Sequence, residues 1–211
     1  MEYPRHVTMI MDGNGRWAGN QGRQRLFGHN AGVESVRSCC EYAARHGIEY
    51  LSIYAFSEEN WARPQAEVTA LMKLMGKCMQ EEYEKFQKNG IRFVVLGNRD
   101  RLPAELNATI DRMTAATAGN DVLTMILFLS YSGKWDIAQA ARCMCEAGDD
   151  DIEKYLVTAG IPDPDLIIRP SGEIRISNFL LWQSAYSEFY FTDVLWPDFS
   201  KEELLNCIRE F

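Results

Sequence analysis

A carboxylate, two glycines and an arginine follow directly after an apolar run near the start of the chain. The segment 9–17 reads MIMDGNGRW, so the apolar residues end at Asp12, with Gly13, Gly15 and Arg16 close behind. Glycine allows the backbone to approach a ligand closely, and a carboxylate is a good ligand for a hard divalent cation. Together these groups suit a phosphate or diphosphate that carries a divalent metal.

Two further groups of basic residues could bind anions. Arg23, Arg25 and His29 follow in a polar stretch that Gly22 and Gly28 are expected to break. A single surface arginine usually has no function, but three basic groups beside a metal-type carboxylate favour an anion site.

The second group lies far along the chain. Arg169 and Arg175 bracket residues 171–173, which follow another apolar run. Two guanidinium groups can hold a diphosphate in bidentate fashion. We therefore expect a second diphosphate near these two arginines.

Six apolar runs predict the strands that position these groups. They cover residues 7–11, 50–56, 91–96, 123–129, 166–168 and 189–191, and helical patterns lie between them. The first four are continuous rather than alternating, which is typical of a parallel sheet buried on both faces. The pattern predicts an α/β fold: a single domain over residues 1–211, with a six-stranded, mostly parallel sheet flanked by helices. Polar clusters follow four of the strands, and such sheets bind ligands at the carboxyl ends of their strands.

The long helix expected between Pro64 and Asn89 has two interpretations. Its apolar face includes Met72, Met75 and Phe86. This face could be ordinary core, or it could line a hydrophobic tunnel for a lipid chain, and periodicity does not separate the two. The acidic run at residues 149–151 predicts a helix start, where negative charge is favoured by the helix dipole.

Composition narrows the class of protein. The 211 residues carry a formal net charge of −8, which argues against nucleic acid as a partner. None of the six cysteines forms a C-x-x-C pair, so reduced cysteines in a cytosolic protein are expected, with a metal site at Cys143 and Cys145 as the alternative. We find no signal peptide and no apolar span long enough for a membrane helix.

Two common motifs fit the opening segment only in part. Residues 13–18 match the dinucleotide fingerprint G-x-G-x-x-A, but Gly19, Asn20 and Gly22 would break the helix that must follow. An EF-hand loop is excluded because Trp17 and Arg23 occupy the positions of its glycine and glutamate. We find no Walker A loop.

The residues quoted so far resemble the signatures of a known family. The chain is similar to the cis-prenyltransferases, the undecaprenyl diphosphate synthase family, in segments that cover almost its whole length in order. These segments are residues 6–18, 28–32, 54–64, 165–173, 175–183 and 191–197.

The resemblance implies roles for individual residues. Asp12 would hold Mg²⁺ on the allylic diphosphate and, with Asn60, would position the proton transfer. The allylic diphosphate would be held by Gly13, Asn14, Gly15, Arg16, Trp17, Arg25 and His29, and by Ser57, Trp61 and Arg63 of a mobile segment that closes over the substrates. Isopentenyl diphosphate would be bound by Arg169, Arg175 and Ser177. Glu188 would support the metal or the dimer-associated side of the site.

The resemblance also implies an activity and a setting. We expect a Mg²⁺-dependent transferase that condenses isopentenyl diphosphate with an allylic diphosphate such as farnesyl diphosphate. The expected product is undecaprenyl diphosphate, a lipid carrier for the cell wall, made in the cytoplasm by a homodimer. Transient contact with a membrane would accompany product release.

Three departures from the family pattern keep alternatives open. Ile174 stands where some relatives have histidine, the stretch 147–154 is shorter than usual, and many relatives continue beyond Phe211 into an arginine-rich tail that helps complete the partner's site. A short-chain or irregular prenyl diphosphate synthase of the same fold is one alternative. A non-catalytic scaffolding subunit is another, although such relatives lack the metal aspartate and early arginines that are present here.

Overall fold

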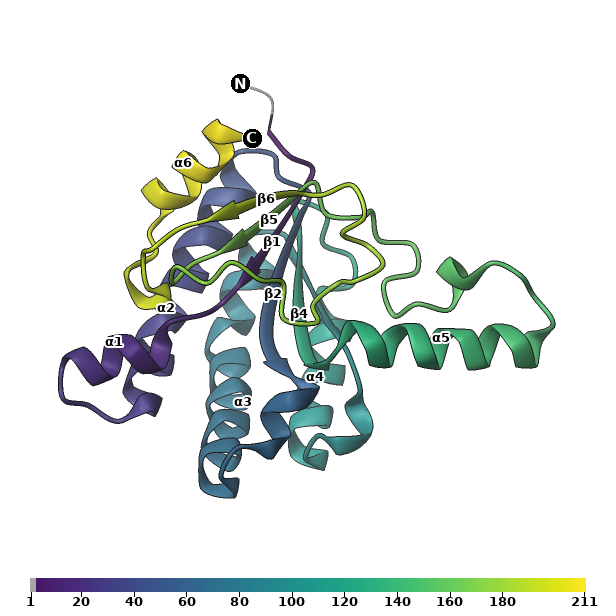
Figure 1. The fold of residues 1–211 in the computed structure, drawn as a ribbon, viewed down its shortest axis with the longest axis horizontal. Coiled ribbons are helices and arrows are strands. Elements are labelled where there is room, and N and C mark those ends of the chain that lie inside the picture. Colours follow the sequence, from purple (N-terminus) through teal and green to yellow (C-terminus); the bar gives the residue numbers. More distant parts are fainter. Residues whose placement is uncertain (1–2) are drawn as a thin grey trace.

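Six parallel strands form one sheet at the centre of the molecule (Figure 1). The structure, a computed structural model, describes residues 3–211, so residues 1 and 2 of the predicted domain lie outside the described residues. The strands are β1 (His6–Ile10), β2 (Tyr50–Ser57), β3 (Ile91–Leu96), β4 (Leu123–Tyr131), β5 (Leu166–Arg169) and β6 (Glu188–Phe191). Their order is β3-β4-β2-β1-β5-β6, and every pairing is parallel. The α/β prediction is confirmed, and the sheet is all-parallel rather than mostly parallel.

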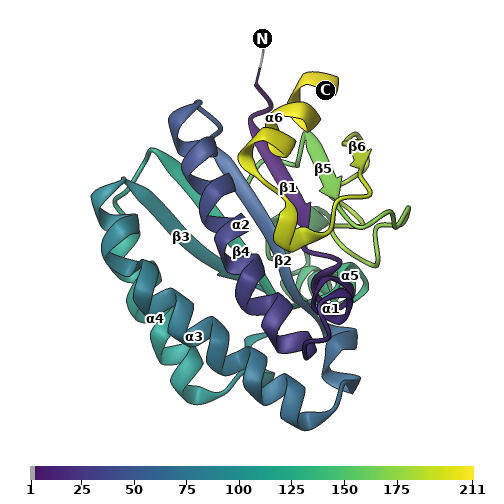
Figure 2. The same ribbon diagram turned by 90° about the vertical axis from the view of Figure 1, so that its left-hand side faces the viewer.

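Helices cover both faces of this sheet. They are α1 (Asn14–Asn20), α2 (Arg25–Arg45), α3 (Gln65–Lys88), α4 (Ala104–Thr117), α5 (Gly133–Ala147) and α6 (Lys201–Glu210), with single 3₁₀ turns η1 (Glu58–Ala62), η2 (Arg99–Arg101), η3 (Ile152–Lys154) and η4 (Trp196–Asp198). Figure 2 shows α2, α3, α4 and α6 on one face, whereas α5 lies beyond the other.

Two apolar clusters explain why the strands are continuously apolar. On β1, Met9 belongs to the larger cluster under α2, α3, α4 and α6, whereas the next residue, Ile10, belongs to the cluster on the opposite face. Successive side chains of a strand point to opposite faces, so a sheet covered on both sides needs apolar residues at every position. The second cluster includes Phe128, Tyr131 and Phe179.

The predicted interruption at Gly28 is wrong, because α2 begins at Arg25 and passes through this glycine. A Cβ at Gly28 would lie 1.9 Å from the carbonyl oxygen of Asn14, and one at Gly32 would lie 2.5 Å from the Asn14 side-chain oxygen. The two glycines therefore allow α1 and α2 to touch backbone to backbone. Gly28 and Gly32 thus serve close helix packing rather than a break, whereas Gly22, with φ 66°, lies in the turn between α1 and α2 as predicted.

An apolar cavity runs between α2, α3 and the sheet. It is lined mainly by apolar side chains, including Met11, Val33, Val36, Leu71, Leu74, Met75, Met79 and Phe86. His29 and Asn14 lie at the end near the carboxyl edge of the sheet, and Asn89 lies at the other end. The cavity follows α2 from His29 to Glu41, a path of about 18 Å at the rise of a helix. Its position is that of the predicted tunnel.

Two smaller expectations concern the surface. The acidic run at residues 149–151 does start a helical element, but only the single turn η3, whose first amides are accepted by Asp149 and Asp151. Cys143 and Cys145 are exposed, and within residues 3–211 no three His, Cys, Asp or Glu residues come together as a metal site. Among the described helices, none is long and apolar enough to cross a membrane.

We predict that Gly28→Ala destabilises the protein by about 1–3 kcal/mol, the usual range for overpacking, because the Asn14 carbonyl must move. Gly19→Ala in α1 is the matched control, since a Cβ there meets nothing within 4 Å. Thermal unfolding should show a Tm lower by several degrees for the first variant only. Equal Tm values for both variants would contradict the packing argument.

Candidate active site

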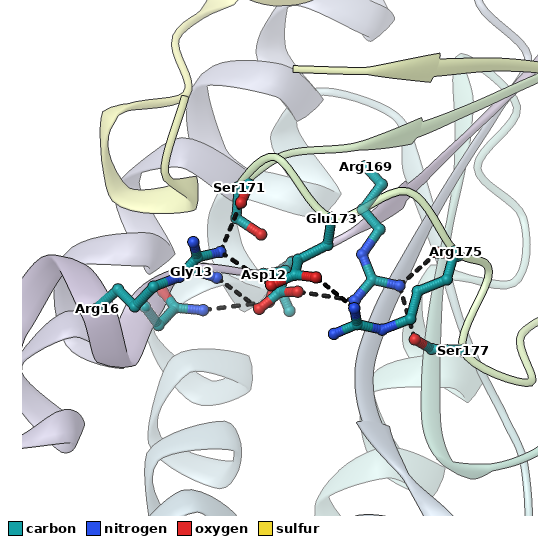
Figure 3. Close-up of polar contacts among 10 residues, drawn as sticks. Asp12, Gly13, Arg16, Arg169, Ser171, Glu173, Arg175 and Ser177 are labelled. Atoms are coloured by element: carbon teal, nitrogen blue, oxygen red, sulfur yellow. Dashed lines mark hydrogen bonds and ion pairs between the residues drawn. The ribbon is translucent and has the colours of Figure 1, made fainter. Parts of the chain in front are cut away.

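Asp12 lies at the carboxyl edge of the sheet, directly after β1, where the loops after β2, β4 and β5 also converge (Figure 3). Its Oδ1 accepts the Gly13 amide at 2.7 Å, and its Oδ2 accepts Arg169 Nη2 at 2.8 Å. Burial on its own raises the pKa of the Asp12 carboxyl, but these hydrogen bonds outweigh it, so the pKa lies below the usual value for aspartate. Asp12 is therefore an ionised carboxylate at neutral pH.

Arg169 is a buried cation at the end of β5, with 4% of its surface exposed. Besides Asp12 it contacts Ser177 Oγ at 2.6 Å and the carbonyl oxygen of Arg175. Its Nε is buried and has no hydrogen-bond partner among the described residues. The sequence assigned Asp12 and Arg169 to two different substrates, and the structure brings them into direct contact.

Glu173 links two further arginines across this edge. It forms an ion pair with Arg175 and lies 3.7 Å from Arg16 Nη2, which also donates to the carbonyl oxygen of Ser171 at 2.6 Å. Ser171 has a left-handed backbone, φ 83°, and a buried hydroxyl without a partner among the described residues. Arg16 and Arg175 thus face the same carboxylate from the two predicted diphosphate sites.

The early glycines have steric reasons. Gly13 has φ 99°, and a Cβ there would lie 2.9 Å from Leu195 and 3.1 Å from Ser171. A Cβ at Gly15 would lie 3.1 Å from the guanidinium carbon of Arg25. The loop therefore needs glycine both for its backbone conformation and for the approach of Arg25.

A second basic cluster joins α2 to the start of α3. Glu67 Oε1 lies 3.4 Å from Arg25 Nε and 3.3 Å from Arg63 Nη1. Burial, together with the positive charges of Arg63 and Arg25, lowers the pKa of His29 to about 4. His29 is therefore neutral at pH 7, and its buried Nε2 has no partner within the described chain.

Four buried polar atoms without a partner among residues 3–211 gather at this edge. They are Asn14 Oδ1, His29 Nε2, Arg169 Nε and Ser171 Oγ. Buried polar groups are normally hydrogen-bonded, so such a concentration indicates a place that a polar ligand completes. Asn14 and His29 also line the apolar cavity, which joins the polar edge to an apolar interior.

The turn η1 carries the residues expected on a mobile segment. Ser57 and Asn60 form a capping box, in which Asn60 Oδ1 accepts the Ser57 amide at 3.2 Å. Trp61 Nε1 donates to Ser130 Oγ at 2.8 Å, and the Arg101 guanidinium lies 4.7 Å from the centre of the Trp61 ring. Asn60 and Trp61 thus both hold the turn itself in shape.

Two predicted site residues lie apart from these clusters. Trp17 donates its indole N–H to Asp198 at 2.8 Å and stacks on Phe27. Glu188 pairs with Leu166 at the start of β5, so it lies at the amino end of the sheet, whereas Asp12 lies at the carboxyl end. Each strand residue spans about 3.3 Å, so the length of the sheet separates the two carboxylates. Glu188 therefore cannot bind the same ion as Asp12 of its own chain.

Several residues of the site had no predicted role. Glu67, Ser171 and Glu173 contact the predicted arginines, and Glu58 contacts Ser130 and Arg101 on the far side of η1. Two of them had a local signal: Glu67 lies four residues after Arg63, in the first turn of α3, and Glu173 lies between Arg169 and Arg175.

Comparisons with known proteins agree with this architecture. A family model described as "Putative undecaprenyl diphosphate synthase" matches residues 10–211. The isoprenyl transferase of Chlorobaculum tepidum is 49% identical over 219 aligned residues, covering 99% of this chain and 83% of its own. The ditrans,polycis-undecaprenyl-diphosphate synthase, (2E,6E)-farnesyl-diphosphate specific, of Yersinia pseudotuberculosis is 44% identical, covering 99% and 87%.

A solved structure shows the same fold. Lavandulyl diphosphate synthase from Lavandula x intermedia, crystallised with dimethylallyl diphosphate, superimposes with a TM-score of 0.94 at 35% identity, covering 99% of this chain and 94% of that one. These matches place the chain in the class of prenyltransferases. It belongs to the undecaprenyl diphosphate synthase family, whose members include the isoprenyl transferases named above.

We predict that His29→Gln weakens the pH dependence of stability. A folded pKa of about 4 lies below the ordinary 6.5, so the unfolded chain binds more protons in that window. Stability from neutral His29 is present above pH 6.5 and is lost as the pH falls towards 4. Urea unfolding gives the free energy of unfolding at each pH, and its rise from pH 4 to pH 8 should be smaller by about 1–3 kcal/mol in the variant.

His6 also contributes to the pH dependence of stability, so the stability of the His29→Gln variant still varies with pH. Burial also lowers the pKa of His6 to about 4, so the variant keeps the His6 share of the slope. Identical profiles for the two proteins would contradict a neutral, buried His29.

Proposed function

We propose that the protein is a Mg²⁺-dependent cis-prenyltransferase that elongates an allylic diphosphate with isopentenyl diphosphate. The observation that carries this proposal is the pair of arginine-rich clusters flanking Asp12 at the mouth of an apolar cavity. Two clusters suit two diphosphates, and the cavity suits a growing hydrocarbon chain. Farnesyl diphosphate is the proposed primer and undecaprenyl diphosphate the proposed product.

The allylic diphosphate is proposed to bind beside the start of α1 and α2. Backbone amides of residues 13–16 and the guanidinium groups of Arg25 and Arg63 supply donors there. Glu67 neutralises both arginines in the structure, so the diphosphate would compete with this carboxylate for them. His29 places a polar ring nitrogen between these arginines and the cavity.

Isopentenyl diphosphate is proposed to bind on the other side of Asp12. Arg175 is exposed, and the Nε of Arg169 and the hydroxyl of Ser171 are both buried without a partner among the described residues. Ser177 holds one nitrogen of Arg169 at 2.6 Å and so fixes the plane of the guanidinium. A planar, oriented guanidinium is well suited to a phosphate.

The residues present fit a magnesium ion. Mg²⁺ is commonly held by one or two protein carboxylates together with substrate phosphates, and Asp12 supplies one ionised carboxylate at this edge. Bound there, the ion would neutralise charge that develops on the departing diphosphate. Asp12 is the ligand we propose, whereas a supporting role for Glu188 would belong to the dimer-associated side.

The reaction joins two carbon skeletons. The allylic C–O bond breaks and its electrons leave with the diphosphate, while the alkene of isopentenyl diphosphate forms the new C–C bond. Loss of one proton from the isopentenyl unit then creates the new double bond. Arg25, Arg63 and the loop amides would stabilise the departing anion, and Asp12 and Asn60 are proposed to position the proton transfer.

A second candidate function is a short-chain or irregular prenyl diphosphate synthase. The close superposition on lavandulyl diphosphate synthase favours it, because that fold agrees over nearly the whole length of both chains. The higher identities to isoprenyl transferases favour long-chain synthesis. Product chain length decides between the two.

We also propose a cytoplasmic homodimer. All six cysteines are free, as is usual in a reducing compartment. Strand β6 is an edge strand with the stacked rings of Phe189 and Phe191, and Tyr186 beside it is almost fully exposed. Exposed strand edges with aromatic residues are typical interaction surfaces. Light scattering should give twice the mass of one chain.

The proposed function is tested by incubating the protein with farnesyl diphosphate, labelled isopentenyl diphosphate and Mg²⁺. Chain elongation is expected, and its absence with every allylic primer tried would overturn the proposal. Chromatography of the products against chain-length standards separates long-chain from short-chain or irregular synthesis.

We predict that Asp12→Asn lowers kcat at least about 100-fold, because the variant keeps the side-chain shape but loses the charge that holds the metal. Asp111→Asn is the control, since Asp111 is an exposed carboxylate on α4 whose one ion-pair partner in the described part of the chain is Arg99. Circular dichroism should show that both variants are folded. Turnover near wild type in Asp12→Asn would refute the metal role.

A further inference from the structure

The turn η1 is held from two sides by its two glutamates. The Glu58 carboxylate accepts a hydrogen bond from the Ser130 hydroxyl, at the end of β4, and lies 2.8 Å from Arg101 Nη1 of η2. Glu59 instead accepts the side-chain amide of Asn178 at 2.6 Å, from the segment after β5. Among the hydrogen bonds of residues 3–211, the Glu59 contact alone joins η1 to the segment that carries Arg175 and Ser177.

Asn178 is fixed in place by the start of α5. Its side-chain oxygen accepts the Lys134 amide at 3.0 Å, and its main-chain oxygen accepts the Gly133 amide at 2.7 Å. Its side-chain nitrogen contacts Ser132 Oγ at 2.9 Å in addition to Glu59. With its acceptors used by a helix end, the amide N–H₂ group of Asn178 is oriented towards η1.

Asn178 follows directly after the residue that holds Arg169. Ser177 Oγ accepts Arg169 Nη1 at 2.6 Å (Figure 3), and both Ser177 and Asn178 have left-handed backbones, φ 51° and 61°. Such conformations persist in non-glycine residues only where the surroundings impose them. A shift of Arg169 is therefore passed through a stiff two-residue turn to the amide that holds Glu59.

We propose that the Glu59–Asn178 hydrogen bond couples the two substrate sites, so that a homoallylic diphosphate at Arg169 and Arg175 strengthens binding of the allylic diphosphate beneath η1. This inference rests on the proposed function. Asn178 and Glu59 are positioning residues, since they act through Arg169 on one side and through η1 and the adjoining Arg63 on the other. The bond is charge-assisted, and such bonds are stronger than neutral ones.

The test measures coupling rather than activity. Calorimetry gives the Kd of farnesyl thiodiphosphate, a slowly reacting analogue, with and without saturating isopentenyl diphosphate, and the ratio of the two values is the coupling factor. Thermodynamic linkage requires the same factor when the ligands are added in the opposite order. The wild type should show a factor of about five or more.

Four variants isolate the hydrogen bond. Glu59→Ala removes the acceptor, and Asn178→Asp removes the donor while it keeps the acceptor for the Lys134 amide. Both should bring the coupling factor close to one. The double variant Glu59→Gln/Asn178→Asp reverses the direction of the bond and should restore most of the factor. Glu58→Ala, which loses the opposite anchor of η1, should change allylic affinity but keep the coupling factor.

The outcomes separate this inference from the proposed function. A wild type that elongates farnesyl diphosphate but has a coupling factor of one overturns the coupling alone. So does a factor that is unchanged in Glu59→Ala, or a double variant that is no better than Asn178→Asp. A wild type that binds neither diphosphate overturns the proposed function itself, and the inference with it.

Discussion

The contact on which the site depends is the ion pair between Asp12 and Arg169. Arg169, with 4% of its surface exposed, must have a counter-charge, because an unpaired buried charge is costly by several kcal/mol. That counter-charge sits at the end of β1, and the arginine sits at the end of the neighbouring β5. The pair fixes the position of the loop after β1 relative to the loop after β5. The contacts of Arg16, Ser171 and Ser177 follow from that placement.

Carboxylates partner five arginines at the carboxyl edge. Asp12 pairs with Arg169, Glu173 lies between Arg16 and Arg175, and Glu67 bridges Arg25 and Arg63. A diphosphate that binds here would exchange one anionic partner for another rather than fill a strongly positive hole. Such an exchange reconciles a cluster of arginines, of which Arg169 is buried and Arg63 half-buried, with an acidic chain, and it lowers the cost of keeping the site folded before substrate arrives.

The sequence predicted the sheet and the location of the site because both depend on local patterns. Continuous apolar runs identify strands covered on both faces, and polar clusters after them identify the carboxyl edge. The error at Gly28 had a different origin, since its role depends on Asn14 of another helix and not on its neighbours. The partnership of Asp12 and Arg169 joins residues 157 positions apart, and no spacing rule reaches that far. Glu188 directly precedes the predicted strand 189–191, so the sequence itself places it at the amino end of the sheet, and a role at the metal was implied by the family resemblance alone.

The close contact between α1 and α2 has a consequence for engineering the product range. Gly28 and Gly32 pack α2 against Asn14, at the start of α1, so any redesign of the α2 wall of the cavity would disturb the turn after β1 as well. Helix α3 forms the facing wall, and beyond its first turn it contacts α2, α4 and β3. Met75 and Met79 line the cavity from α3, so exchanging them would change the cavity without altering the glycine contacts between α1 and α2. Chain length could evolve, or be designed, along one helix while the chemistry stays fixed on the other.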